Sequence, residues 1–303
     1  MAGTLYLQTD IGSDIDDTWA LAMILKSPEL KLKMVLTDTD DTVYRAALAC
    51  RMLQIAGRED VEVAAGIVQW PPHVFDLRQR DCVAHYDPDT YPRFNRDGVN
   101  RFIEAIRAEP EPVALVAIGP VPTLAAALRK APDIASKIDF YGMFGSVYRG
   151  YDNAPEISAE YNVLADVAAA RTVFAAKWHS VTITPLDTCG LARLDRTRYG
   201  RLLKSEEPLL REVIKMYREW NFRVYGTETE PEESTILYDT VAVHMAMSEE
   251  FYRTEEVKLI VDDKGFTRID PSGAPIRAAV EWTDLEGYCD DLTGRLLRPV
   301  VPR

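Results

Sequence analysis

Short apolar runs alternate with amphipathic segments along the chain up to about Leu186. Runs rich in Val, Ile and Leu predict strands at residues 4–8, 32–37, 61–65, 113–118, 138–144 and 180–185. Between them, apolar positions recur at helical spacing and predict helices at residues 17–26, 43–56, 99–107, 121–130 and 167–176. Strands and helices that alternate in this way are typical of βα units. We therefore expect an α/β fold in which helices flank an open, mostly parallel sheet.

Beyond Leu186 this alternation fades. The pattern there predicts a long helix at residues 207–225 and a second helix that starts near Asp239. A ribbon of short strands at 257–262, 267–269 and 277–282 follows, and a helix at 285–297 closes the chain. The acidic loop 226–234 is a lid candidate, although such a run is more often a solvated loop. The chain has no internal repeat and no Gly/Ser-rich linker, so we expect one domain over residues 1–303.

Composition narrows the classes of partner. The 303 residues carry a formal net charge of −13, which argues against a surface that binds nucleic acid or anionic lipid. The N-terminus has no basic segment followed by an apolar run, and no stretch is apolar for long enough to span a membrane. We expect a cytoplasmic protein with a small-molecule substrate. The cysteines are widely spaced and are expected to be reduced thiols: Cys50, Cys82, Cys189 and Cys289.

Four carboxylates follow the first predicted strand within eight residues: Asp10, Asp14, Asp16 and Asp17. The carboxyl end of a strand is where an open α/β sheet binds its ligands. Like charges this close disfavour ionisation unless a cation offsets them, and hard oxygen ligands suit calcium or magnesium and not zinc. Gly12 permits a tight turn inside the cluster. The competing interpretation is an acidic loop that caps the next helix and is otherwise solvated.

This segment resembles the opening signature of the inosine-uridine preferring nucleoside hydrolase family, a strand ending in Asp-x-Asp-Pro-Gly-x-Asp-Asp before an Ala- and Leu-rich helix. Gln8 stands in place of the first signature Asp, and two extra residues precede the final Asp pair. The resemblance implies that Asp10 is the general base and a metal ligand, that Asp17 is a bidentate metal ligand and that Asp16 holds the ribose. Asp14 has no counterpart and is a candidate additional ligand.

Further segments resemble the family's later motifs, in the expected order: residues 116–123, 160–162 and 238–242. The first implies a metal ligand at the backbone carbonyl of Ile118. The second resembles Glu-Phe-Asn and implies that Glu160 and Asn162 bind ribose hydroxyls. The third resembles His-Asp-Pro-x-Ala, so Asp239 completes the metal shell and Tyr238 stands where the family has a His that protonates the leaving base.

Other positions follow from spacing within the resemblance. The run 37–41 places Asp41 where the family has a ribose-binding Asn, with Asp38 as the alternative. Asn153 corresponds to another Asn on the ribose side, and His85 lies where the family has a His near the substrate. The resemblance also implies a bound Ca²⁺, a Rossmann-like nucleoside hydrolase fold, and a homodimer or homotetramer.

The implied reaction is hydrolysis of the N-glycosidic bond of a purine or pyrimidine ribonucleoside to ribose and free base. A transition state of oxocarbenium character needs an activated water, acceptors on the ribose diol and help for the departing base. Two alternatives remain open. One is a ribosyl-binding protein of the same fold without catalysis or with altered specificity, because Gln8 and Tyr238 depart from the family pattern. The other is an Asp-dependent phosphatase, which Gly12 disfavours because that chemistry expects a second Asp there.

Overall fold

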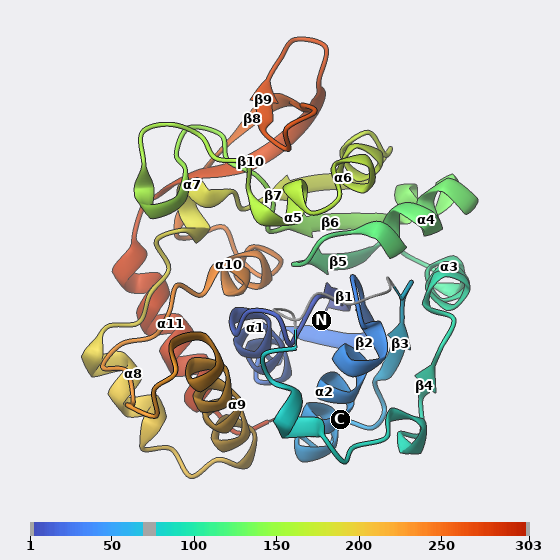
Figure 1. Ribbon diagram of the computed structural model, residues 1–303. Helices are drawn as coiled ribbons and strands as arrows, with labels where there is room; N and C mark the ends of the chain where they lie inside the picture. Colours follow the sequence, from blue (N-terminus) through green and yellow to red (C-terminus); the bar gives the residue numbers. More distant parts are fainter. Residues whose placement is uncertain (1–2, 69–76, 301–303) are drawn as a thin grey trace.

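The computed structural model describes residues 3–68 and 77–300 of the chain. Within these residues one sheet runs through the molecule in the order β4-β3-β2-β1-β5-β6-β7-β10-β8-β9 (Figure 1). The strands from β4 to β10 in this order are parallel, and β8 pairs antiparallel with both β10 and β9. Their bounds are β1 Gly3–Thr9, β2 Leu30–Thr37, β3 Glu62–Ala65, β4 Phe94–Asn95, β5 Val113–Ala117, β6 Ile138–Gly142, β7 Ser180–Ile183, β8 Tyr252–Val261, β9 Thr267–Ile269 and β10 Ala274–Trp282.

Helices cover both faces of this sheet, as the alternating pattern predicts (Figure 1). One face packs against α1 Asp16–Leu25, α2 Thr42–Ile55, α8 Arg196–Leu203, α9 Pro208–Tyr225, α10 Tyr238–Met245 and α11 Leu285–Leu297. The other packs against α3 Gly98–Ala108, α4 Pro122–Lys130 and α6 Val167–Phe174. Short helices complete the chain: α5 Tyr161–Leu164, α7 Leu186–Cys189, and the 3₁₀ turns η2 Arg80–Val83, η3 Pro88–Thr90, η4 Pro132–Lys137 and η5 Tyr151–Asn153.

Alternation along β1 shows how the strands join the two layers. Leu5 and Leu7 are fully buried in the cluster that contains α1 and α2, whereas Tyr6 belongs to the cluster on the opposite face. Successive side chains of a strand point to opposite faces, so a strand covered on both sides reads as a continuous apolar run. This is why the sequence pattern located the strands well.

Polar side chains fix where several helices begin. The carboxylates of Asp41, Asp97, Asp166 and Asp284 accept backbone N–H groups in the first turns of α2, α3, α6 and α11. The expected elements are all present, with ends that differ by a few residues. The sequence pattern missed α8, the short helices α5 and α7 and the short strand β4, and β8 begins earlier than expected. None of the described helices is both long and apolar enough to cross a bilayer.

The acidic loop 226–234, a lid candidate, is tied to the surface instead. Glu230 pairs with Arg218 on α9 at 2.6 Å, and Glu233 pairs with Arg193 at 2.6 Å. Asn221 on α9 also donates to two carbonyls of the loop. These contacts favour the solvated-loop interpretation.

The sheet order creates a crevice beside β1. The chain proceeds from β1 through α1 to β2 on one side, whereas β5 pairs with the other side of β1. Connections that leave in opposite directions open a space at the carboxyl ends of the two strands, where α/β proteins bind ligands. Residues 10–17 follow β1 and residues 118–121 follow β5. The acidic segment therefore lies at this switch point.

Candidate active site

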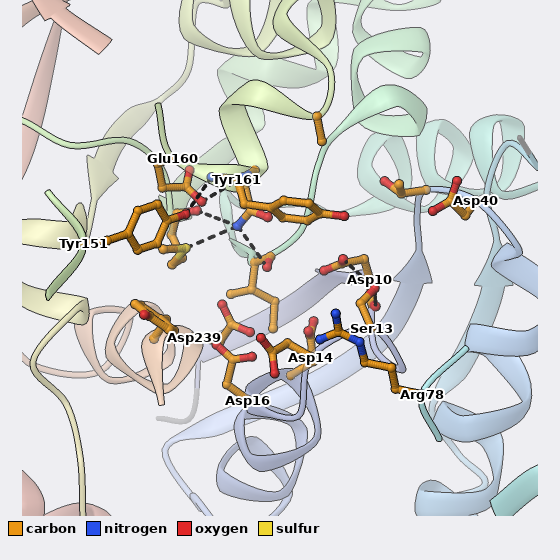
Figure 2. A pocket seen from close by; sticks show the side chains of 17 residues that line it. Asp10, Ser13, Asp14, Asp16, Asp40, Arg78, Tyr151, Glu160, Tyr161 and Asp239 are labelled. Carbon is orange, nitrogen blue, oxygen red and sulfur yellow. Dashed lines mark hydrogen bonds between the residues drawn. The ribbon is translucent and has the colours of Figure 1, made fainter. Parts of the chain in front are cut away.

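A pocket of about 650 Å³ lies at this edge of the sheet. Its walls come from the segments after β1, β2, β5 and β6, from η5 and α5, and from the start of α10. Figure 2 shows several acidic side chains directed toward the same space, among them Asp10, Asp14, Asp16 and Asp239. Residues remote in the sequence thus meet in one acidic pocket.

The carboxylates of Asp16, Asp17 and Asp239 form the core of this pocket. One oxygen from each lies within 4.8 Å of the others, and all three side chains are buried. Burial raises the pKa of each carboxyl well above its usual range, and the neighbouring carboxylates raise it further. Keeping these groups ionised therefore requires a cation. The described lining contains no His or Cys, so the donor set fits a hard divalent ion such as calcium or magnesium.

Asp10 lines the same pocket but lies outside this closest triad, which contains Asp16 in place of the expected Asp10. The side chain of Asp10 turns toward Ser13, whose hydroxyl donates to Oδ2 at 3.1 Å. Its other oxygen lies over Gly119, where an added Cβ would come within 2.5 Å of Oδ1. Asp10 is 4% exposed, and burial raises its pKa. A buried carboxylate of raised pKa next to a cation site suits a general base.

A buried arginine holds the loop that carries Asp10. Arg45 on α2 is 1% exposed and donates to the backbone carbonyls of Asp10, Ile11 and Thr39 and to the Ser13 hydroxyl. The segment after β2 needs this support because Thr39 and Asp40 adopt positive φ of 69° and 52°. Arg45 therefore joins the loops after β1 and β2.

Replacing Arg45 by Met is expected to lower the free energy of unfolding by about 3 to 5 kcal/mol, because buried carbonyls lose their donor and the carboxylates of Asp10 and Asp17 lose a buried cation behind the pocket wall. Urea denaturation followed by circular dichroism measures the change. The matched control is Arg51→Met on the same helix, which removes the partly exposed ion pair with Glu212 and should cost about 1 kcal/mol or less. Equal losses in the two variants would contradict the role given to Arg45.

Glu160 and Asn162 lie on the opposite wall. The carboxylate of Glu160 accepts the backbone N–H groups of Gly145, Asn162 and Val163 and begins α5, and burial outweighs these bonds and raises its pKa to about 7. The amide nitrogen of Asn162 donates to the carbonyls of Ile118 and Met143 at 3.2 and 3.0 Å. Because both amide protons are used, the Asn162 side chain offers its oxygen to a ligand. The Ile118 carbonyl keeps a second lone pair.

Aromatic residues form the remaining wall. The rings of Tyr151 and Tyr238 meet edge to face with centroids 6.4 Å apart. Burial, and then the nearby Cys189 and Asp16, raise the pKa of Tyr238 well above its usual range, so its phenol stays protonated. The Tyr151 hydroxyl accepts the backbone N–H of Tyr161, whose own side chain lines the pocket and is 45% exposed.

The structure does not bring three expected ligand-binding residues to the described pocket wall. Asp41 caps α2 through the backbone N–H of Tyr44, and its neighbour Asp40 lines the pocket instead. Asn153 is exposed on η5 with φ of 57°, and Tyr151 from the same turn takes the inward position. His85 is exposed in the turn after η2.

The alternative Asp38 has a structural role, and so does Gln8. The Asp38 carboxylate accepts the backbone N–H and hydroxyl of Thr123 at the start of α4, and burial raises its pKa to about 7. The Gln8 amide donates to Asp38 and to the Pro120 carbonyl. An amide in place of the family's Asp avoids a second buried carboxylate beside Asp38.

Several lining residues were missed by the sequence analysis: Ser13, Thr39, Asp40, Arg78, Met143, Tyr151, Tyr161 and Ala165. Tyr161 lies inside the Glu-Tyr-Asn motif and Ser13 inside the acidic segment, so both carried a usable signal. Arg78 precedes η2 in a region without clear periodicity, and nothing in the sequence pattern pointed to it.

The chain is similar in sequence and in fold to several known proteins. The sequence model described as inosine-uridine preferring nucleoside hydrolase matches residues 5–283. The chain is 26% identical to uridine nucleosidase 1 of Arabidopsis thaliana, covering 97% of this chain and 93% of that protein. It is 27% identical to the pyrimidine-specific ribonucleoside hydrolase RihA of Salmonella arizonae, covering 98% of this chain and 99% of that protein. The structure of the plant nucleoside hydrolase PpNRh1 superposes with a TM-score of 0.78 at 21% identity, covering 99% of this chain and 100% of that one.

Proposed function

Because this chain belongs to the inosine-uridine preferring nucleoside hydrolase family and is thereby a hydrolase of ribonucleosides, we propose that the pocket at β1 and β5 is its active site. The observation that carries the proposal is the convergence of Asp10, Asp16, Asp17 and Asp239 in one buried group. We also keep the predictions that residues 1–303 act as one domain, that the protein is cytoplasmic and that it forms a homodimer or homotetramer.

The proposed ion is Ca²⁺, held by the carboxylates of Asp17 and Asp239 and the Ile118 carbonyl, with Asp10 at its edge. The donor set supports this choice because it consists of oxygens in a pocket with room for several ligands. When bound, the ion neutralises the carboxylates and supplies an electrostatic anchor for water and the ribose diol.

Asp10 is the proposed general base. It takes a proton from the attacking water while the water oxygen bonds to C1′ of the ribose. The C1′–N bond breaks, and its electron pair leaves with the base, which then takes up a proton. Ser13 and Arg45 fix the Asp10 loop, so the base is oriented before the substrate arrives.

The ribose is gripped by acceptors on both walls. Asp16 belongs to the metal triad, and Asp40, Glu160 and the Asn162 side-chain oxygen line the same pocket. Acceptors on the diol draw electron density toward the sugar and favour a transition state with positive charge at C1′. The opposing walls therefore suit a furanose ring bound between them.

A nucleoside panel tests the proposal. Uridine, cytidine, inosine and adenosine are incubated with the enzyme, and free base is measured by chromatography with and without EDTA. Release of base from at least one nucleoside, lost on chelation, is expected. Calcium and ribose binding without any release of base would instead select the alternative of a ribosyl-binding protein that does not catalyse.

Tyr238 carries a prediction about the leaving group. A phenol of raised pKa donates a hydrogen bond but is a much weaker acid than an imidazolium, so bases that need protonation should leave slowly. We expect nitrophenyl riboside to be cleaved with a much higher kcat/KM than inosine, and Tyr238→His to narrow this ratio. The measurement is that ratio in the wild type, Tyr238→Phe and Tyr238→His. Equal efficiency on both substrates, with no effect of Tyr238→Phe, would make Tyr238 a packing residue.

A further inference from the structure

Arg78 is the one cationic side chain among the described residues that line the pocket, and six aspartates and Glu160 line the same pocket. Figure 2 shows its side chain reaching into the pocket near Asp14 and Ser13. The described residues place no carboxylate within salt-bridge distance of its guanidinium. Its neighbour Arg80, in contrast, is absent from the described pocket lining and pairs with Asp81 at 3.8 Å, where both side chains are exposed.

The backbone around Arg78 is fastened to the acidic segment. Its N–H donates to the Gly12 carbonyl at 3.1 Å. The adjoining Gln79 is fully buried, accepts the Thr18 hydroxyl at 3.0 Å and donates to the Asp14 carbonyl at 3.1 Å. These contacts fix the backbone of Arg78 beside the catalytic loop, so that its side chain starts from a set position, which favours preorganisation of the donor.

Burial divides the pocket into an inner and an outer part. Asp16, Asp17 and Asp239 are nearly inaccessible, whereas Asp14 and Tyr161 are exposed at the mouth. A polar ribose bound among the buried carboxylates would leave the flat base directed outward. Arg78 lies beside Asp14 and therefore on the base side.

Resting on the function proposed above, we propose that Arg78 donates hydrogen bonds to carbonyl oxygens of the departing base. When the C1′–N bond breaks, the electron pair moves into the base and onto those oxygens, where the guanidinium stabilises it without transferring a proton. The leaving base takes its proton from solvent afterwards. The pocket then selects bases that carry a carbonyl next to the glycosidic nitrogen, as uracil does, over adenine, which has none. Arg78 would thereby stabilise the leaving base, a role that the family's His has and that Tyr238 in its place fills only weakly.

The test compares Arg78→Met and Arg78→Lys with the matched control Arg80→Met. Uridine, adenosine and nitrophenyl riboside are the substrates, because nitrophenolate leaves readily without a donor. In Arg78→Met, kcat for uridine is expected to fall roughly 10- to 100-fold, the loss of a hydrogen bond from a charged donor, with little change for nitrophenyl riboside. Arg78→Lys should recover part of the loss, and millimolar guanidinium should partly rescue Arg78→Met. Arg80→Met should match the wild type.

Other outcomes overturn the assignment. Equal losses on uridine and nitrophenyl riboside would make Arg78 a structural residue. Uridine 5′-monophosphate is assayed as a further substrate, and a loss confined to it would place the guanidinium on a phosphate. If the wild type cleaves no riboside, the proposed function fails, and calorimetry of uridine binding still decides the inference: weaker binding by Arg78→Met than by Arg80→Met supports it, and equal binding overturns it.

Discussion

Asp10→Asn is expected to lower kcat about 10²- to 10⁴-fold while leaving the fold intact, because an amide cannot accept the proton of the attacking water. The amide is nearly isosteric with the carboxylate and still accepts the Ser13 hydroxyl through its oxygen. KM should change much less than kcat, since the diol acceptors remain. Steady-state kinetics on nitrophenyl riboside measures both constants, and circular dichroism checks the fold.

Asp41→Asn is the matched control for this change. Asp41 is also an acidic residue after a strand of the sheet, but its side chain caps α2 and is absent from the described pocket wall. Asn is an equally good N-cap, so stability and turnover should stay close to wild type. Near wild-type turnover by Asp10→Asn would place the base elsewhere, and Asp14→Asn is then the next variant to measure.

Asp40 and Asp41 are neighbours in the sequence, but only Asp40 lines the described pocket, and the sequence alone does not distinguish them. The spacing of the resembling motif predicts that Asp41 binds the ribose, but the direction in which a side chain points depends on the local backbone conformation. Thr39 and Asp40 adopt left-handed conformations that turn Asp40 into the pocket and leave Asp41 at the first turn of α2. The pattern of hydrophobic and polar residues does not predict such a left-handed turn. Asn153 likewise has a positive φ, and it is exposed on η5 outside the described pocket lining.

Elements of regular structure were predictable because their signal is local. The buried strands read as apolar runs, and the helices have an apolar face at helical spacing and Asp caps. The meeting of Asp17 with Asp239 is not local, and only the order of motifs along the chain indicated it. Arg78 belongs to no motif and no periodic segment, so its place in the pocket required the structure.

Removal of divalent ions is expected to abolish nearly all turnover, and added Ca²⁺ is expected to restore it. Three buried carboxylates within 4.8 Å cannot all stay ionised without a cation, and a protonated cluster no longer positions water and ribose. The enzyme is dialysed against EDTA, assayed, and titrated with Ca²⁺, Mg²⁺ and Zn²⁺. Full activity in metal-free enzyme would count decisively against the site. Asp239→Asn should raise the Ca²⁺ concentration that is needed to restore turnover, whereas Asp41→Asn should leave that concentration unchanged.

Stability gives a second measurement that does not depend on turnover. In metal-free protein the pKa values of Asp16, Asp17 and Asp239 are raised by burial and by one another. Groups with a raised folded pKa favour folding below their unfolded pKa and lose that contribution as pH rises through the folded value. Metal-free protein should therefore lose stability as pH rises from about 4, whereas bound Ca²⁺ requires the ionised carboxylates.

The rise in Tm on adding Ca²⁺ should accordingly be larger at high pH than at low pH. At a free concentration 100 times Kd, a ligand that binds only the folded state stabilises it by about 2.7 kcal/mol. Thermal unfolding across a pH series, with Ca²⁺ or with EDTA, measures the difference, and Asp239→Asn should flatten its pH dependence. A calcium shift that is the same at every pH would mean that the ion binds without displacing protons. The acidic triad would then not be its site.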